Sequence, residues 1–416
     1  MSPTKVIIAG CGIAGPVLAV FLKSKGYSPV IYERNKRDLD ATGLSLMLQP
    51  NGLRLLSILP GFDLSAIPSQ TADEARFFSW MPEAQIPLAS STDFAAGLER
   101  FGFQPRGVER SELHKLLIEH ALKSGIDIKW DQKLVAVTQG DGEVRVDLET
   151  RAGDKSSDTA SFVVGCDGLH SGTRSALFGE HQADFTGCTQ TGGMTLIKDL
   201  PKSRSKVTAM STVYGNGSSM IMYPVSETKI SWAITQHEAE ERETWRGMDQ
   251  EKQEQVKKGP HSEWGFDSEG IVANAQRMVK YGLYDRKELP NWHKDRVVLL
   301  GDAAHPTSPH LGQGANQAFE DIYHLVRLLV KHNPTASPLP TEKLSEIFEE
   351  YQILRKARTT ALVRGARAMG ELRSTSGVEA CLARNEIVKN MYTDEAKLLG
   401  QMAFLFDAPF TGAPEI

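Results

Sequence analysis

The stretch KVIIAGCGIAG at residues 5–15 decides the fold of this chain. After Lys5, residues 6–9 form a short apolar run rich in β-branched side chains, which predicts a buried parallel strand. The run continues into the pattern Gly-x-Gly-x-x-Gly and then into PVLAVFLK at residues 16–23, which has the pattern of a helix. A second apolar run, PVIY at 29–32, ends in Glu33 and predicts the next strand. The chain therefore opens with a strand–helix–strand unit of a parallel α/β fold.

Each glycine of this unit, and the acid that ends it, has a physical task. Gly10 permits a tight turn, Gly12 lets the backbone approach a pyrophosphate, and Gly15 lets the helix and the strand pack closely. The helix N-terminus offers free N–H groups and a partial positive charge to phosphates. A carboxylate after the second strand, here Glu33, accepts the hydroxyls of an adenosine ribose. The unit predicts an ADP-containing dinucleotide, and the alternative is a glycine-rich turn in an unrelated α/β protein.

Composition excludes several classes of function. The 416 residues exceed one typical core, so two closely associated domains are expected. A net charge of −5 without a basic tract argues against a nucleic-acid partner. No apolar run approaches the roughly 20 residues of a membrane span, and none suits a signal peptide. The four cysteines lack C-x-x-C spacing and disulfide density, which indicates reduced thiols in a cytoplasmic enzyme without a metal site.

Apolar periodicity predicts the remaining elements. Further buried strands are expected at 43–48, 162–166 and 296–300. Helices are expected near 53–58, at 112–122 with Ser111 as its N-cap, and from Ala315 onward. Residues 60–104 lack helical periodicity and predict strands of another layer. A second strand-rich stretch, 186–284, includes a charged, solvent-facing helix at 237–258.

The arginine-rich segment 342–373 predicts a long helix near the C-terminus. We interpret its arginines (Arg355, Arg358, Arg364, Arg367 and Arg373) as a solvated brace across the back of the molecule. The alternative is a site for a phosphate or an acid.

Three separate loops each follow a predicted strand, at residues 10–15, 167–174 and 301–316. In an open α/β sheet ligands collect at the carboxyl ends of strands, so the three loops can converge on one elongated ligand. A nicotinamide dehydrogenase would need only the first loop. Asp302 suits the hydroxyls of a ribityl chain, and the helix start at Gly312–Gly314 offers N–H groups to a ring edge that becomes anionic on reduction. The ligand predicted is FAD.

These motifs resemble those of the flavoprotein aromatic hydroxylases, the group A flavin monooxygenases related to p-hydroxybenzoate hydroxylase and salicylate hydroxylase. The resemblance covers roughly residues 4–375. It rests on the glycine pattern with Glu33, on CDGLHSGTR at 166–174, and on GDAAHP at 301–306 with PHLGQGAN at 309–316. It implies a mixed α/β and α+β protein: a Rossmann-like FAD-binding domain of the glutathione-reductase type, an inserted antiparallel-sheet substrate domain and C-terminal helices.

The resemblance also divides the chain into domains. Residues 1–70, 105–185 and 285–335 would form the FAD-binding domain. Residues 71–104 and 186–284 would form the substrate domain, and 341–416 a C-terminal helical segment.

The same resemblance implies roles for single residues. Glu33 would hold the adenosine ribose, Asp302 the ribityl chain, and Asp167 would serve both FAD and the nicotinamide cofactor. Pro309 would lie over the flavin. Arg110 matches an arginine that contacts the pyrophosphate or ribityl region, and Arg106 is the alternative. The cofactor-binding residues predicted in full are Gly10, Gly12, Ile13, Ala14, Gly15, Glu33, Arg34, Gly43, Arg110, Asp167, Asp302, Pro309, Gly312, Gln313, Gly314, Ala315 and Asn316.

The activity implied is an FAD-dependent monooxygenase that uses NADPH or NADH and O₂. It would hydroxylate, epoxidise or oxidatively rearrange an aromatic or electron-rich small molecule through a C4a-hydroperoxyflavin, as a monomer or homodimer. One alternative is another flavin oxidoreductase on the same scaffold, such as a reductase or a halogenase, although the halogenase tryptophan signature is missing. The other is a non-catalytic flavin-binding module.

The candidate residues for catalysis each have a structural alternative. Tyr223 would position a phenol or be a half-buried sheet tyrosine. His305 would be a base or a structural hydrogen-bonding group. Ser171 and Arg174 would contact the cofactor or order their own loop. Arg204 would pair with a substrate carboxylate or phenolate, or lie in an exposed loop.

Overall fold

A six-stranded sheet contains the N-terminal strand and carries the three loops. The computed structural model describes residues 3–37, 43–180, 182–201, 207–239, 246–410 and 416. The strand order is β19-β20-β12-β1-β2-β8, with β19 antiparallel to β20 and the others parallel. The bounds are β1 Lys5–Ala9, β2 Ser28–Glu33, β8 Asp127–Trp130, β12 Phe162–Gly165, β19 His293–Lys294 and β20 Val297–Leu299. The predicted strands of the parallel core are confirmed to within two residues.

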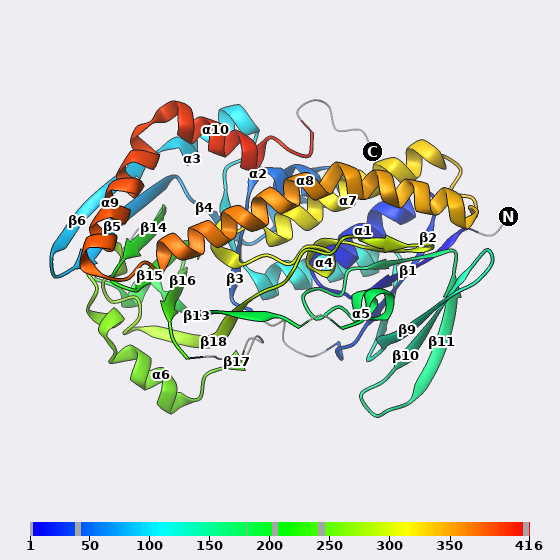
Figure 1. The fold of residues 1–416 in the computed structure, drawn as a ribbon, viewed down its shortest axis with the longest axis horizontal. Coiled ribbons are helices and arrows are strands. Elements are labelled where there is room, and N and C mark those ends of the chain that lie inside the picture. The colour runs from blue at the N-terminus through cyan, green and yellow to red at the C-terminus, as the bar shows by residue number, and fades with distance from the viewer. Residues whose placement is uncertain (1–2, 38–42, 181, 202–206, 240–245, 411–415) are drawn as a thin grey trace.

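Strand β1 is apolar from Val6 to Ala9 because both of its faces are covered there. Val6 and Ile8 pack into a core formed with the helices, whereas Ile7 and Ala9 pack toward a three-stranded sheet. Both faces therefore exclude water, as expected for a parallel strand. The helices in contact with this region are α1 Ala14–Ser24, α4 Arg110–Lys123 and α7 Gly314–His332. The three-stranded sheet is β9 Lys133–Gln139, β10 Val144–Glu149 and β11 Lys155–Ala160 (Figure 1).

An eight-stranded sheet fills the other end of the molecule (Figure 1). Its order is β17-β18-β13-β16-β15-β14-β5-β6, antiparallel except for the pair β14 and β5. The bounds are β5 Glu74–Met81, β6 Ala84–Ser91, β13 Asp184–Leu196, β14 Ala209–Tyr214, β15 Ser218–Ser226, β16 Lys229–His237, β17 Arg246–Gly247 and β18 Ala275–Asp285. The strand-rich layers predicted from residues 60–104 and 186–284 therefore join into one sheet.

Two predictions in this region were wrong in detail. Residues 60–104 also contain a short helix, α3 Asp93–Phe101, with a glycine in its interior, so the prediction of strands alone was wrong there. It ends at Gly102, which has a left-handed φ of 77°. The charged helix expected at 237–258 is shorter, because the described helix α6 spans Gln250–Lys257 and is preceded by β17.

A small sheet joins the two larger ones. It consists of β3 Ser45–Leu48, β7 Arg106–Glu109 and β4 Ser69–Thr71. A Cβ atom at Gly107 would overlap the carbonyl oxygen of Pro224, so glycine lets β7 lie directly on β15. Helix α2 Pro50–Ser57 follows β3, and α4 begins at Arg110. Ser111 therefore lies inside the first turn of α4, and the prediction that it is the N-cap was wrong.

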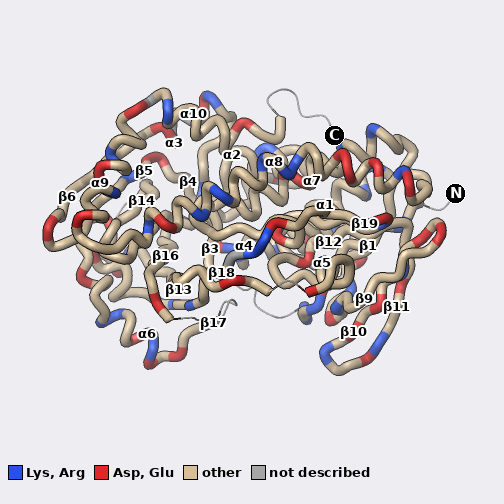
Figure 2. Tube along the Cα trace, in the orientation of Figure 1, with Lys and Arg blue, Asp and Glu red and all other residues tan. Residues whose placement is uncertain are grey.

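The C-terminal segment consists of three helices, α8 Thr341–Arg373, α9 Val378–Thr393 and α10 Glu395–Phe406. Helix α8 runs along the molecule from the six-stranded sheet to the eight-stranded sheet (Figure 1). Basic and acidic residues are interspersed along the chain, with several of the basic ones on α8 (Figure 2). Arg355 of α8 is only 1% exposed, so the prediction of a solvated arginine face was wrong at this position.

The remaining described helices are short. They are α5 Gly172–Phe178 and the 3₁₀ turns Leu64–Ala66, Ile197–Asp199, Pro260–Glu263, Phe266–Ser268, Gly301–Ala303 (η6) and Pro309–Leu311 (η7). Among the described helices, none combines the length and the apolar character that a membrane crossing requires.

Candidate cofactor and substrate site

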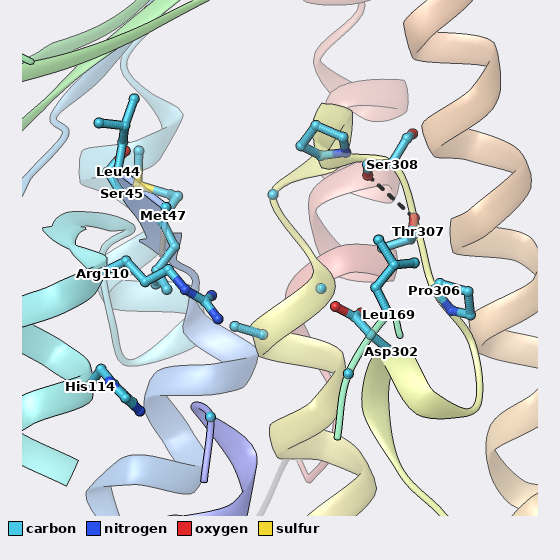
Figure 3. Close-up of a pocket in the computed structure, with 18 of the residues that line it drawn as sticks. Leu44, Ser45, Met47, Arg110, His114, Leu169, Asp302, Pro306, Thr307 and Ser308 are labelled. Atoms are coloured by element: carbon cyan, nitrogen blue, oxygen red, sulfur yellow. Dashed lines mark hydrogen bonds between the residues drawn. The ribbon is translucent and has the colours of Figure 1, made fainter. Parts of the chain in front are cut away.

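A cavity of about 1360 Å³ extends from the N-terminal glycine loop to the eight-stranded sheet. This volume exceeds the roughly 300–1,000 Å³ of an ordinary small-molecule pocket, so the cavity can hold more than one ligand. All three predicted loops line it, and so do strands of the small sheet and of the eight-stranded sheet. Figure 3 shows lining residues from the second loop, the third loop and the small sheet. The convergence predicted for the loops is therefore observed.

The cavity includes most of the residues predicted to bind a cofactor. Those that line it are Gly10, Gly12, Glu33, Arg34, Gly43, Arg110, Asp167, Asp302, Pro309, Gly312, Gly314 and Ala315. Five others lie behind the lining: Ile13, Ala14, Gly15, Gln313 and Asn316. Arg106 is also absent from the lining, whereas Arg110 is present, so the geometry favours Arg110 of the two arginines. Arg204 lies outside the described residues.

The N-terminal loop is shaped by its three glycines. Gly10 has a φ of +99°, and a Cβ there would come within 2.6 Å of the Cys166 carbonyl oxygen. A Cβ at Gly15 would overlap the carbonyl oxygen of Gly10. A Cβ at Gly12 would meet no atom within 4 Å, and this residue lines the cavity. Gly10 and Gly15 therefore close the turn, whereas Gly12 leaves bare backbone toward the cavity.

Two side chains hold the loop in place. The Glu33 carboxylate accepts hydrogen bonds from the Cys11 N–H at 2.7 Å and from the Asn35 N–H at 2.8 Å. His114 of α4 lies with its Nε2 2.6 Å from the Cys11 carbonyl oxygen. Glu33 therefore also braces the glycine loop, a task that the motif alone did not indicate.

The second loop is ordered by its own polar groups. Asp167 accepts hydrogen bonds from the Thr173 N–H and hydroxyl, both at 2.9 Å, and from the Ser171 hydroxyl. Ser171 in turn caps α5, accepting from the Arg174 N–H at 2.9 Å. Arg174 donates to the carbonyls of Leu169, Asp302 and Ala303 and so joins the second loop to the third. Ser171 and Arg174 thus have the structural roles that we kept as alternatives.

The third loop places the acidic side chain of Asp302 opposite the basic side chain of Arg110. Asp302 and Arg110 point toward one another across the cavity (Figure 3). Among the described residues, neither the Asp302 carboxylate nor the Arg110 guanidinium has a hydrogen bond. Burial raises the pKa of Asp302, and the charges of His305, Arg110 and Arg174 only partly offset this. Burial likewise lowers the pKa of Arg110. The cavity therefore contains one acceptor and one donor that a bound ligand can satisfy.

Two further glycines shape the cavity, Gly43 beside Arg110 and Gly312 in the third loop. Gly43 has a φ of +103°, and a Cβ there would come within 2.8 Å of the Arg110 side chain. Gly312 adopts the left-handed conformation, with φ +62° and ψ 24°, just before α7 begins. The α7 N-terminus consequently presents its free N–H groups next to the cavity.

Asn316 and Gln313 fasten the third loop to the small sheet. The Asn316 amide donates to the carbonyls of Met47 at 3.0 Å and Gly312 at 2.8 Å, and accepts from the Gln49 N–H at 3.1 Å. Gln313 hydrogen-bonds the side chains of Gln49 and Asn51. Gln49 and Asn51 were not among the predicted residues, although the turn sequence QPNG at 49–52 marked their position. The two predicted residues thus position the loop from behind.

His305 lies outside the cavity lining and has a structural partner. Its Nε2 is 2.6 Å from Asp321 Oδ2 of α7. Asp321 also accepts from the Gly301 N–H at 2.9 Å and from Arg355 Nε at 2.7 Å. Arg355 pairs in addition with Glu320 at 2.6 Å. His305 therefore belongs to a buried ionic network under the third loop, which agrees with the structural alternative.

Tyr223 lies on β15 with its side chain at the cavity. Its hydroxyl is 2.8 Å from the Ser45 hydroxyl, which donates to the Ser231 hydroxyl at 2.6 Å. Burial raises the pKa of Tyr223, and the hydrogen bond with Ser45 partly offsets it. The tyrosine is therefore neutral near pH 7 and presents a hydroxyl chain to the cavity.

These features fit FAD. The bare backbone at Gly12 suits a pyrophosphate, and the unsatisfied Arg110 and Asp302 suit a phosphate oxygen and a sugar hydroxyl. The start of α7 suits the edge of a ring that carries negative charge. The lining residues of all three loops form one continuous cavity, as an extended dinucleotide requires.

Replacing Asp302 by asparagine is expected to change apoprotein stability and FAD affinity in opposite directions. Removing a buried carboxylate whose pKa is raised favours the folded apoprotein at pH 7, so its free energy of unfolding should equal or exceed that of the parent. Loss of the charged acceptor should raise the FAD dissociation constant about tenfold or more. Urea unfolding and an FAD titration measure the two effects, with the exposed Asp199→Asn as the control. Unchanged FAD affinity would contradict contact between Asp302 and the cofactor.

Comparisons with known proteins agree with this geometry. The chain is 28% identical over 415 residues to 3-amino-4-hydroxybenzoate 2-monooxygenase of Streptomyces cremeus, with 97% of each chain covered. It is 27% identical to 3-hydroxybenzoate 6-hydroxylase 1 of Aquipseudomonas alcaligenes, with 93% of each chain covered. The fold matches the crystal structure of Klebsiella pneumoniae HpxO complexed with FAD and uric acid with a TM-score of 0.80. That match has 20% identity and covers 98% of this chain and 97% of the other.

The sequence also matches the FAD binding domain family over residues 3–366. The match spans all three cavity-lining loops, the small sheet and the eight-stranded sheet. The α/β fold and the FAD cofactor predicted from the glycine loop, the Asp-Gly loop and the Gly-Asp loop are therefore confirmed. The chain belongs to the FAD-binding domain family.

Proposed function

We propose that this protein is an FAD-dependent monooxygenase that hydroxylates an aromatic or similarly electron-rich small molecule. One observation carries the proposal: the cavity lined by the three cofactor loops continues without a break to the eight-stranded sheet. A substrate ring can therefore lie beside the third loop and be enclosed by that sheet. The relatives named as monooxygenases and hydroxylases, which match this chain over nearly its whole length, support the same activity.

The protein's part in this reaction is binding and orientation. Bound FAD, reduced by NADPH or NADH, supplies the activation of O₂ and the transfer of one oxygen atom to the substrate. Arg110 would neutralise a phosphate oxygen, Asp302 would accept a ribityl hydroxyl, and Glu33 would accept from the adenosine ribose. The N–H groups at Gly312 to Ala315 would stabilise negative charge on the ring edge. Asp167 would serve both cofactors, although Thr173 and Ser171 already occupy much of its carboxylate.

The substrate side of the cavity combines apolar walls with one hydroxyl chain. Leu44, Ile221 and Trp232 line it together with Tyr223 and Ser45. Apolar walls exclude water from the reacting ring, and the Tyr223 hydroxyl would position a phenolic oxygen by hydrogen bonding. We infer that residues 71–104 and 186–284 act as the substrate domain. Residues 1–70, 105–185 and 285–335 would act as the cofactor domain.

Isotope incorporation tests the proposed activity directly. The purified FAD-loaded protein is supplied with NADPH or NADH, ¹⁸O₂ and a panel of phenols and aminophenols, both unsubstituted and carrying alkyl or aryl substituents. A monooxygenase places one ¹⁸O atom in the hydroxylated product and consumes one equivalent of reduced nicotinamide cofactor for each product formed. A product without ¹⁸O, or no oxidation with any member of the panel, would contradict the proposal and favour a reductase, a halogenase or a binding module.

The variant Tyr223→Phe is expected to lower kcat/KM for a phenol about tenfold, because one hydrogen bond to the ring oxygen is lost. It should also increase the share of NAD(P)H oxidation that yields hydrogen peroxide. Steady-state kinetics with product quantification measures both. Tyr27→Phe is the matched control, because the Tyr27 hydroxyl is hydrogen-bonded to Asn333 and lies outside the cavity. Equal kinetics in the two variants would assign Tyr223 a purely structural place in the sheet.

A further inference from the structure

Part of the cavity wall comes from the three C-terminal helices, which no motif connects with binding. We name this part the C-terminal chamber. Its lining residues are Met369 of α8, Met391 and Tyr392 of α9, and Leu398, Met402 and Leu405 of α10. Phe406 continues the apolar wall, Gln401 adds an amide, and Arg373 lies at the edge. None of these residues belongs to the three cofactor loops, so the chamber is available to the substrate.

The chamber has the chemistry of an apolar binding site. Its six defining side chains carry no charge. Across the whole cavity, five of the twelve methionines of the chain line the wall: Met47, Met210, Met369, Met391 and Met402. Methionine is flexible and polarisable, and it suits surfaces that adapt to apolar ligands. A small, polar aromatic acid would leave this wall without a complementary partner.

Contacts on the outer side of α9 and α10 fix these helices in place as walls of the chamber. The Tyr392 ring stacks on Phe77 of β5, with centroids 3.9 Å apart. The Phe406 ring meets Phe101 of α3 edge to face at 5.4 Å. Arg54 of α2 donates to the backbone carbonyls of both Phe101 and Phe406. Helices α9 and α10 are thus fastened to α2, α3 and β5 without filling the chamber.

Helix α8 connects the chamber with the third cofactor loop. A Cβ at Gly370 of α8 would come within 2.7 Å of the His310 ring, so the helix packs directly on η7. Arg373, one turn further along, lies 3.5 Å from His310 Nδ1. Burial and the Arg373 charge lower the pKa of His310 to about 3, so the ring is neutral at physiological pH. A ligand bound beside Pro309 can therefore extend past a neutral His310 into the chamber.

We propose that the C-terminal chamber binds an extended apolar substituent of the substrate. The natural substrate is then an aromatic or electron-rich ring that carries an alkyl chain or an apolar ring system, not a free small aromatic acid. The reacting ring lies beside the third loop and Tyr223, and the substituent lies among α8, α9 and α10. This inference rests on the proposed function only for the place of the reacting ring.

Binding of 4-alkylphenols to the FAD-loaded protein tests the inference. The series runs from one to eight carbons, and the change in flavin absorbance reports binding without turnover. Each methylene that enters the chamber should tighten binding by up to about fourfold, until the chamber is full. No dependence of affinity on chain length would overturn the inference.

Two neighbouring residues of α10 provide a matched pair of variants. Leu398 is 7% exposed and lines the chamber, whereas Leu399 is 38% exposed and does not. The gain in affinity per methylene should fall in Leu398→Asn and stay at the parent value in Leu399→Asn. Leu405→Gln, at a half-buried lining position, gives the same test if Leu398→Asn does not fold. Equal gains in the chamber variants and the control would contradict the proposed site.

The failure of this inference can be told apart from failure of the proposed function. Incorporation of ¹⁸O is measured with every member of the 4-alkylphenol series, so the monooxygenase activity is tested both with and without a substituent that reaches the chamber. Incorporation without any dependence of affinity on chain length would overturn the chamber alone. A normal dependence on chain length without incorporation would overturn the monooxygenase alone.

Discussion

Gly15→Ala is expected to destabilise the apoprotein by about 3 kcal/mol and Gly12→Ala by less than about 0.5 kcal/mol, although both change the same loop. The difference follows from the space around each residue. A methyl group at Gly15 would overlap the Gly10 carbonyl oxygen, which is backbone and has no room to move. A methyl group at Gly12 would enter open space in the cavity. Urea unfolding of the apoproteins measures both values.

FAD affinity should not follow apoprotein stability in this pair. If the pyrophosphate lies against Gly12, the added methyl group occupies its place, and the dissociation constant of FAD should rise at least tenfold while the apoprotein keeps its stability. A titration of each apoprotein with FAD, followed by flavin fluorescence, gives the dissociation constants. Parent-like affinity in Gly12→Ala would show that the phosphates lie elsewhere along the cavity.

Arg355→Met is expected to lower the free energy of unfolding by about 3–5 kcal/mol, because it removes a buried cation that pairs with two buried carboxylates. Arg355 pairs with Asp321 at 2.7 Å and Glu320 at 2.6 Å, and all three side chains are at most 1% exposed. Methionine fills much of the same volume, so the loss reports the charge. Arg364→Met on the exposed face of α8 is the control and should stay within about 0.5 kcal/mol of the parent.

The Arg355 effect should depend on pH in a defined direction. Burial alone raises the pKa of Asp321, but His305 and Arg355 outweigh it and hold that pKa far below its usual range. This lowered pKa contributes stability above about pH 4, the unfolded-state value, and the contribution is lost as the pH falls further. Without Arg355 the pKa of Asp321 rises, so the difference between variant and parent should be largest at neutral pH and shrink in acid. A difference independent of pH would contradict this account.

The sequence predicted the convergence of the three loops on one cavity because its signals are local. A glycine that must hold φ near +99°, such as Gly10, is recognisable from its neighbours in the chain. The same holds for Asp302, which directly follows a buried strand.

The positions that sequence reasoning missed depend on long-range contacts. Arg355 looked solvated because its partners, Glu320 and Asp321, lie on another helix, and no local pattern connects them. The role of the Asn316 side-chain amide, which bonds Met47 and Gln49 of another part of the chain, likewise follows only from the structure. Lining residues on α9 and α10 carried no signal at all, since methionine and leucine read as ordinary core.

The strand order of the six-stranded sheet determines when the growing chain can first bind FAD. Strand β1 pairs on one side with β2, which follows immediately, but on the other side Val6 pairs with Phe162 of β12. β12 in turn needs Val297 of β20, which leaves the ribosome much later. Cys166, which packs against the Gly10 turn, follows β12, and Asp302 is made only after β20. Such long-range pairing slows folding, so we expect the nascent chain to capture FAD only after most of it has been translated.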